Sequence, residues 1–227
     1  MKKMGNGQSF LTRAIVSRRV NFGEMDRIVE LLTPQGKISA MAKGVRREKS
    51  KLAGGIEPFS LSEVTLVVGK GDLYTLSSAK MVRFFQGVLG DMEKLEFAGE
   101  MVRKAARAMG QVTHEDYFDL LQQGLMGIDE GVNLSLVRAW FWLNLAKMSG
   151  EEVNLYTDNT GEKLMVQRKY VWNFNERCFA RSEAGNEVEM IKMMKILLSV
   201  KLAMARKIKG GEKYLVDIAK IGESLVS

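Results

Sequence analysis

The sequence predicts an α+β protein in which a small closed β-barrel precedes a mainly α-helical domain with a small β-rich insertion. Three observations support this prediction. Strand and turn patterns fill residues 10–81, helical periodicity begins near residue 84, and no proline follows Pro58. The 227 residues suffice for one large domain or two modest ones, and we place two domains at residues 1–82 and 83–227.

Five short strands are expected in the first domain. Each is rich in β-branched or aromatic residues or alternates apolar and polar side chains. Turns separate them, including Thr33-Pro34-Gln35-Gly36 and the hairpin turn Gly69-Lys70-Gly71-Asp72. Five strands in about 70 residues favour a closed barrel, which leaves no exposed sheet edge, and the OB-fold is the five-stranded candidate. The expected strands cover residues 10–20, 28–32, 37–43, 61–68 and 73–79.

Five helices are expected in the second domain. Thr113 is the expected N-cap of a helix that carries Tyr117 to Leu125, and Gly150 stands where a cap would end a helix. Between residues 151 and 187 the helical periodicity breaks. Stretches 153–156 and 164–166, on either side of a turn, are compatible with strands, so we expect a β-rich insertion there. Apolar spacing places the other four helices at residues 92–109, 134–148, 187–208 and 214–225.

The distribution of charge points to a nucleic-acid partner. The net charge of +7 comes from residues 1–83, which hold 15 Lys and Arg against 7 Asp and Glu, whereas residues 84–227 hold 19 against 20. Residues 43–51 read Lys-Gly-Val-Arg-Arg-Glu-Lys-Ser-Lys and carry five cations directly after the third expected strand. A strand that ends in such a loop presents positive charge to a polyanion.

The candidate nucleic-acid-binding residues are the five cations of this loop and four from neighbouring strands and turns. We expect them to converge on one groove of the barrel and to hold phosphates. Exposed aromatic side chains would add base stacking, but a small barrel needs large interior side chains, so we expect its aromatic residues in the core. These aromatic residues are Phe10, Phe22, Phe59 and Tyr74. The candidate cations are Lys43, Arg46, Arg47, Lys49, Lys51, Arg18, Arg19, Lys37 and Lys70.

Residues suited to catalysis or metal binding are sparse. His114 is the only histidine and Cys178 the only cysteine, which excludes an internal disulfide and a zinc site made of several cysteines. The spacing of Asp158, Glu162 and Glu176 fits no known metal-binding loop. We therefore expect no enzymatic activity, no cofactor and no bound metal.

The sequence also lacks features of a membrane or secreted protein. No uninterrupted apolar run approaches the ~20 residues that a membrane span needs. The first residues, Met-Lys-Lys-Met-Gly-Asn, are not followed by the apolar region of a signal peptide. We expect a soluble, cytoplasmic protein without a membrane partner.

Four short elements follow one another in the first third of the chain: Gly-Glu-x-Asp at 23–26, Thr-x-x-Gly-Lys at 33–37, Ala-Lys-Gly-x-Arg at 42–46 and Lys-Ser at 49–50. In this order and spacing they resemble the RecO family of bacterial recombination mediators. The resemblance covers about residues 11–80. Beyond these residues the likeness is only that of a helical domain, with Arg138-Ala-Trp140 and a Leu-rich helix ending at Gly150.

The resemblance implies a nucleoid-associated mediator of DNA repair and recombination that binds single- and double-stranded DNA. It implies annealing of complementary strands coated with single-strand-binding protein (SSB), whose acidic C-terminal tail would dock on the helical domain. It further implies help in loading RecA together with RecR. Many family members carry a four-cysteine zinc knuckle, but Thr157 and Thr160 stand where its first cysteine pair would lie. The resemblance therefore implies a zinc-free version of the insertion.

Two other functions stay open. An OB-fold RNA-binding factor would prefer structured RNA to single-stranded DNA. A docking adaptor would bind a partner protein through a methionine-rich groove with basic rims and would have negligible affinity for DNA. The residues of such a groove would be Met190, Met193, Met194 and Met204, with Arg138, Lys147, Lys192 and Lys195 at its rims.

Overall fold

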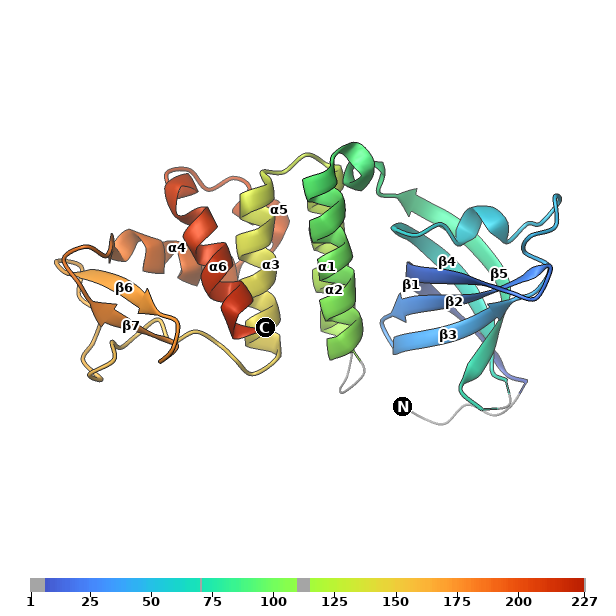
Figure 1. Ribbon diagram of the computed structural model, residues 1–227, viewed down its shortest axis with the longest axis horizontal. Helices are drawn as coiled ribbons and strands as arrows, with labels where there is room; N and C mark the ends of the chain where they lie inside the picture. Colours follow the sequence, from blue (N-terminus) through green and yellow to red (C-terminus); the bar gives the residue numbers. More distant parts are fainter. Residues whose placement is uncertain (1–6, 70, 110–114, 227) are drawn as a thin grey trace. The chain divides into compact units, whose positions relative to one another are not determined.

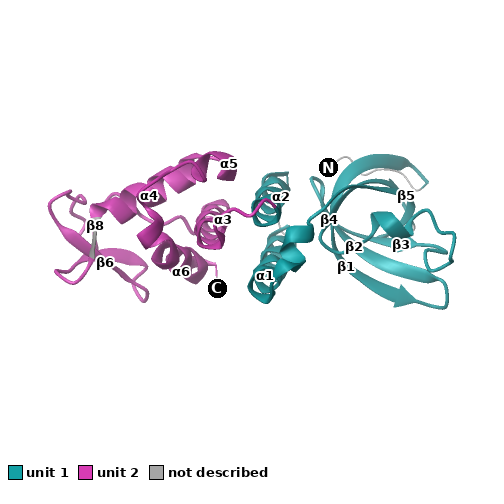
Figure 2. Ribbon diagram, turned by 90° about the horizontal axis from the view of Figure 1, so that it is seen from above, with its two compact units in different colours: residues 1–129 teal, residues 130–227 magenta. Residues whose placement is uncertain are grey.

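The computed structural model describes residues 7–69, 71–109 and 115–226, so Lys70, Thr113 and His114 lie outside the described residues. The α+β class is confirmed, because a five-stranded barrel precedes the helices and a second, smaller sheet follows (Figure 1). Two compact units divide the chain, Met1–Asp129 and Glu130–Ser227 (Figure 2). No helix in the described part of the chain combines the length and apolar character needed to cross a membrane.

The first unit contains the predicted OB barrel. Its strands close in the order β1-β2-β3-β5-β4, with β3 and β5 parallel and the other neighbours antiparallel. This order confirms the five-stranded Greek-key barrel. The strands are β1 (Ser9–Phe22), β2 (Asp26–Thr33), β3 (Gly36–Ala42), β4 (Ser60–Val67) and β5 (Leu73–Phe84).

Apolar side chains at alternate positions of the strands fill the interior of the barrel. Every second residue of β2 and β3 points inward, so that Val29, Leu31 and Ala40 are fully buried in the interior cluster. In β1 a bulge shifts the register between Val16 and Arg18. Beyond this bulge β1 and β2 continue as a paired hairpin as far as Phe22 and Asp26.

Two helices cover part of the outer surface of the barrel. α1 (Met92–Ala108) contacts β1, and α2 (Glu115–Asp129) contacts β2. Ile15, Leu32 and Leu61 are neighbours in register and are buried, although they are not in the interior cluster. These side chains face away from the interior, and burial under the helices removes their apolar surface from water.

The first compact unit therefore extends past the domain boundary that we predicted after residue 82. Asp129, at the end of α2, lies 2.6 Å from Nη2 of Arg83 through Oδ2 and accepts the N–H of Gly87 through Oδ1 at 2.8 Å. On β1, Arg13 forms an ion pair with Asp119 of α2. These contacts join α2 to the barrel, which residue spacing alone does not reveal. Within the described residues, the 3₁₀ turns are η1 (Ala53–Gly55), η2 (Gln86–Gly90) and η3 (Glu212–Tyr214).

The second unit is built around α3 (Leu134–Met148). This helix is apolar on all sides and buries Trp140, Phe141 and Trp142, which is expected of a helix that other elements surround. It packs against α6 (Leu215–Leu225) and α4 (Val188–Ser199).

The single helix predicted over residues 187–208 is wrong, because the chain breaks between α4 and the short α5 (Leu202–Ala205). Side chains of α3 bind the carbonyl groups at the end of α4. The indole of Trp140 donates to the carbonyl of Val200 at 2.9 Å, and the amide of Asn144 donates to that of Leu197 at 3.2 Å. With these carbonyls already bound, Lys201 adopts an extended conformation, with ψ of 153°.

The predicted β-rich insertion is present as a three-stranded sheet in the order β7-β6-β8. The stretches 153–156 and 164–166 are not strands, and the prediction was wrong there. Asn154 explains the first of them, because its side-chain oxygen accepts the N–H groups of Tyr156 and Thr157 and forms a turn. The strands are β6 (Lys169–Asn173), β7 (Cys178–Arg181) and β8 (Asn186–Glu187).

Candidate nucleic-acid interface

The basic loop, residues 43–51, begins where β3 ends and is fixed to the barrel at that point. Gly44 has φ of +63°, a conformation that favours glycine, and its N–H donates to Oδ1 of Asp26 at 2.7 Å. Val45 is 2% exposed and belongs to the interior cluster. The start of the loop is therefore fixed to the barrel, and the loop leaves the barrel in a defined direction.

Arg46 joins the loop to the turn between β1 and β2. Its backbone N–H donates to the carbonyl of Met25 at 2.9 Å, and its guanidinium Nη1 donates to the carbonyl of Gly23 at 3.3 Å. The loop and the β1–β2 hairpin consequently lie at the same end of the barrel (Figure 1).

All five cations of the loop are exposed to solvent. None of the ion pairs between described residues involves them, and the only partner of Arg46 outside the loop is neutral backbone. Their charge is thus available to an external polyanion. The cations are Lys43, Arg46, Arg47, Lys49 and Lys51.

Arg18 and Lys37 lie on the outer face of β1, β2 and β3. Arg18 is exposed and stands opposite Glu30, which in turn stands opposite Ser39. Nζ of Lys37 lies 3.6 Å from Oε2 of Glu30, so a carboxylate offsets part of the charge on this face. Arg18 and Lys37 can contact a ligand on this face, but they contribute less net charge than the basic loop.

Arg19 does not join this group. Neighbouring residues of a strand point to opposite faces, and Arg19 stands opposite the core residue Val29. Its guanidinium is half-buried and forms an ion pair with Glu57. Of the nine predicted cations, eight lie in the described residues, because Lys70 does not. Seven of these eight are exposed, and Arg19 is the exception.

The expectation that all four aromatic residues belong to the core is wrong for Phe22, whose side chain is 51% exposed. Phe10 and Tyr74 do pack against the interior cluster, with ring centroids 6.1 Å apart. The alternation of Arg18, Val20 and Phe22 after the bulge places all three on the outer face. In the sequence, the position of these residues just before the turn at Gly23, away from the apolar centre of β1, could have indicated that they are exposed.

The β-rich insertion does not fit a zinc knuckle. Among the described residues no three or more His, Cys, Asp or Glu side chains gather in a metal-binding arrangement. Cys178 donates its thiol proton to Oε2 of Glu176 at 3.7 Å, and burial raises the pKa of the thiol, with a further rise from Glu176. A protonated thiol beside a single carboxylate is a poor zinc ligand and a poor nucleophile.

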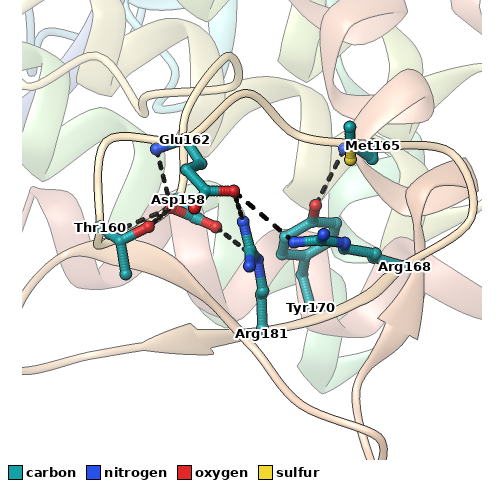
Figure 3. Close-up of polar contacts among 7 residues, drawn as sticks. All are labelled: Asp158, Thr160, Glu162, Met165, Arg168, Tyr170 and Arg181. Carbon is teal, nitrogen blue, oxygen red and sulfur yellow. Dashed lines mark hydrogen bonds and ion pairs between the residues drawn. The ribbon is translucent and has the colours of Figure 1, made fainter.

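Ion pairs and hydrogen bonds hold the insertion together instead (Figure 3). Oδ1 of Asp158 accepts the hydroxyl and the N–H of Thr160, at 2.6 and 3.0 Å, and the N–H of Glu162 at 3.1 Å. Its Oδ2 lies 2.8 Å from Nε of Arg181, which also pairs with Glu162. Arg168 approaches the same Glu162 carboxylate at 3.7 Å. We call this set the Asp158 clasp.

The clasp predicts a pH-dependent loss of stability in a D158N variant. The hydroxyl of Thr160, and then backbone N–H groups and Arg181, hold the pKa of Asp158 below its usual value of 3.8. The ionised carboxylate thus stabilises the fold above pH 3.8, and this contribution is lost as the pH falls through the lower pKa of the folded state. At pH 7 we expect D158N to melt several degrees below the wild type in circular-dichroism scans.

The difference in melting temperature should shrink as the pH falls below 4, since the wild type loses the same charge there. The matched control is E183Q, which neutralises an exposed carboxylate in the turn between β7 and β8. Equal melting of D158N and the wild type at pH 7 would show that the clasp is not structural.

The four methionines of the predicted groove do not line a common surface among the described residues. Met190, Met193 and Met194 are at most 6% exposed and belong to the packed interior of the second unit, whereas Met204 alone is well exposed. A groove of about 270 Å³ lies instead beside β6 and α6. It is lined by Val171, Trp172, Phe174, Met190, Asp217, Lys220 and Ile221.

A closed five-stranded barrel with a fixed, exposed basic loop defines an OB-fold protein with a cationic face. The chain is 32% identical over 170 residues to DNA repair protein RecO of Dehalococcoides mccartyi, a match that covers 74% of this chain and 67% of that protein. Residues 8–85 match the family model described as recombination protein O N terminal. The chain belongs to the RecO family.

Further relatives carry the same name. DNA repair protein RecO of Rubrobacter xylanophilus is 32% identical over 143 residues, or 62% of this chain and 57% of that protein. That of Acetivibrio thermocellus is 42% identical over 92 residues, or 40% of this chain and 36% of that protein. The matched segments thus span between about a third and two thirds of the lengths of these relatives.

Proposed function

We propose that this protein is a non-enzymatic mediator of DNA repair and recombination that binds single- and double-stranded DNA and anneals complementary strands coated with SSB. The observation that supports it most is the basic loop, which is exposed, free of acidic partners among the described residues and fixed at one end of an OB barrel. OB barrels bind oligonucleotides on the face of strands 2 and 3 and on the adjoining loops.

The loop would act by neutralising phosphates. Each phosphate contact releases counterions, which favours binding at low salt. When cations hold the backbones of two strands, the repulsion between the strands falls and base pairing can proceed. Phosphate contacts position a strand without reading its bases, so we expect little sequence specificity.

The proposed partners beyond DNA are SSB, RecR and, indirectly, RecA. Support for them comes from membership of the RecO family. An acidic tail needs apolar walls beside a cation. The groove beside α6 offers Trp172, Phe174 and Lys220, with Asp217 as the one carboxylate in its lining. We place the SSB tail there as part of the proposal. This work would be done in the cytoplasm, on the nucleoid.

A direct competition experiment separates this proposal from an RNA-binding factor and from an adaptor. Fluorescence anisotropy would follow a labelled single-stranded DNA oligonucleotide bound to the protein. Unlabelled DNA of equal length should displace it at least as well as a structured RNA hairpin, because we expect the protein to recognise neither base edges nor A-form geometry. A clear preference for the RNA would favour the RNA-binding factor, and the absence of DNA binding at low salt would favour the adaptor.

A further inference from the structure

An apolar strip lies on the outer face of the barrel, next to the basic loop. Val20 and Phe22 share this face with Arg18, because they follow it at intervals of two residues along β1. Val20 is 44% exposed and Phe22 is 51% exposed. The strip continues in register from Val20 to Ile28 of β2 and Met41 of β3, which are half-buried. We call Val20, Phe22, Ile28 and Met41 the apolar strip.

Cations border the strip. Arg18 precedes Val20 on the same face, and Lys43 follows Met41 by two residues at the end of β3. The guanidinium of Arg46 is bound to the carbonyl of Gly23, the residue that follows Phe22. One carboxylate lies at the same border: Asp26 stands opposite Phe22 and accepts the N–H of Gly44. A ligand seated on the strip would therefore meet apolar surface at its centre and, at its margins, three cations and this one carboxylate.

We propose that the apolar strip is a stacking platform for the bases of a single strand, with Phe22 as the residue on which a base stacks. This inference rests on the proposed function and names the form of nucleic acid that the site prefers. A single strand offers an apolar base face and a charged backbone side by side, which matches the strip and its cationic border. In a duplex the base faces are stacked on one another, so only the phosphates of a duplex can contact this site, through the cations that border the strip.

The dimensions of the strip agree with this ligand. It crosses three neighbouring strands, which lie about 4.8 Å apart, and so leaves room for two or three consecutive bases. An exposed phenylalanine on a strand contributes nothing to the barrel interior, which Val29, Ala40 and their neighbours already fill. Its exposed ring is instead available to stack on the face of a nucleic-acid base.

The test compares single-stranded and duplex binding of an F22A variant. Anisotropy of a labelled oligo(dT) should show about a five- to hundredfold loss of affinity, the range for one stacked base, with an unchanged salt slope. Binding of a matched duplex should stay as in the wild type. F22Y, which keeps the ring, should bind as the wild type does. The control is L11A, which truncates a side chain that is 69% exposed at the other end of β1.

A second readout reports stacking directly. Trp140, Trp142 and Trp172 are at most 6% exposed, so the indole introduced in an F22W variant should dominate fluorescence changes on binding. Oligo(dT) should quench it, whereas vesicles of phosphatidylglycerol should leave its emission unshifted. A blue shift with vesicles would overturn the proposal in favour of a lipid surface.

The two levels of the proposal fail differently. Unchanged single-strand affinity in F22A, while the wild type binds DNA in a salt-dependent way, would overturn the stacking platform and leave the proposed function intact. A wild-type protein that binds no DNA at low salt would overturn the proposed function, and the platform with it.

Discussion

Reversing the charge of Arg46 and Arg47 should weaken the binding of single-stranded DNA about 25-fold at 0.1 M salt, and the slope of log K against log salt should become about 1.4 less steep. Each phosphate contact on a single strand contributes about 0.7 to this slope, so the loss of two contacts makes the slope about 1.4 less steep. Since 0.1 M is ten times below the 1 M reference, the affinity at 0.1 M should fall by a factor of about 10 to the power 1.4, or about 25. The measurement is a salt titration of oligonucleotide affinity by anisotropy with the R46E/R47E variant.

The expected effect is large because the barrel holds these cations in place. Gly44 and Val45 fix the start of the loop, so little conformational freedom remains to be lost on binding. The matched control is K207E/K209E, which changes the net charge equally at exposed positions after α5 in the second unit. Equal affinity of R46E/R47E and the wild type at 0.1 M would exclude the basic loop as the phosphate-binding element.

Removing the carboxylate of Asp129 should destabilise the first unit by about 2 kcal/mol. Its side chain is 12% exposed and lies 2.6 Å from Arg83, and it also accepts the N–H of Gly87. Breaking a buried pair costs about 3–5 kcal/mol, and we reduce this value because the Arg83 side chain is 35% exposed and water can screen it. The measurement is the free energy of unfolding of D129A from urea titration.

The same variant tests whether the contacts of Asp129 stabilise the joint between α2 and the barrel. The matched control is E96A, which removes an exposed carboxylate from α1 and should leave the free energy of unfolding within about 0.5 kcal/mol of the wild type. If D129A were as stable as E96A, the ion pair with Arg83 would be no more than a solvated surface contact.

Local sequence patterns predicted much of the fold. Alternation in the β-strands and apolar periodicity in the helices follow from burial on one face, which neighbouring residues report directly. The break after α4 did not follow from such a pattern. It depends on Trp140 and Asn144, which bind the carbonyls of Val200 and Leu197 from more than fifty residues away in the chain.

The candidate site shows the same division. The basic loop could be predicted because its charges are adjacent in the sequence. The ion pair of Arg19 with Glu57 could not, since its partners lie 38 residues apart and meet only when the barrel closes. Phe22 is exposed because the bulge after Val16 shifts the alternation of β1: Ala14 and Val16 face the interior, whereas Phe22 lies on the outer face.

Annealing of SSB-coated strands tests the central claim most directly. Two complementary oligonucleotides, one with a donor and one with an acceptor fluorophore, would be coated with SSB and mixed with and without the wild-type protein or R46E/R47E. We predict that the wild type accelerates annealing, that the acceleration disappears at high salt, and that R46E/R47E gives little of it. No acceleration by the wild type at low salt, with uncoated strands equally unaffected, would contradict the proposal that this protein is an annealing mediator.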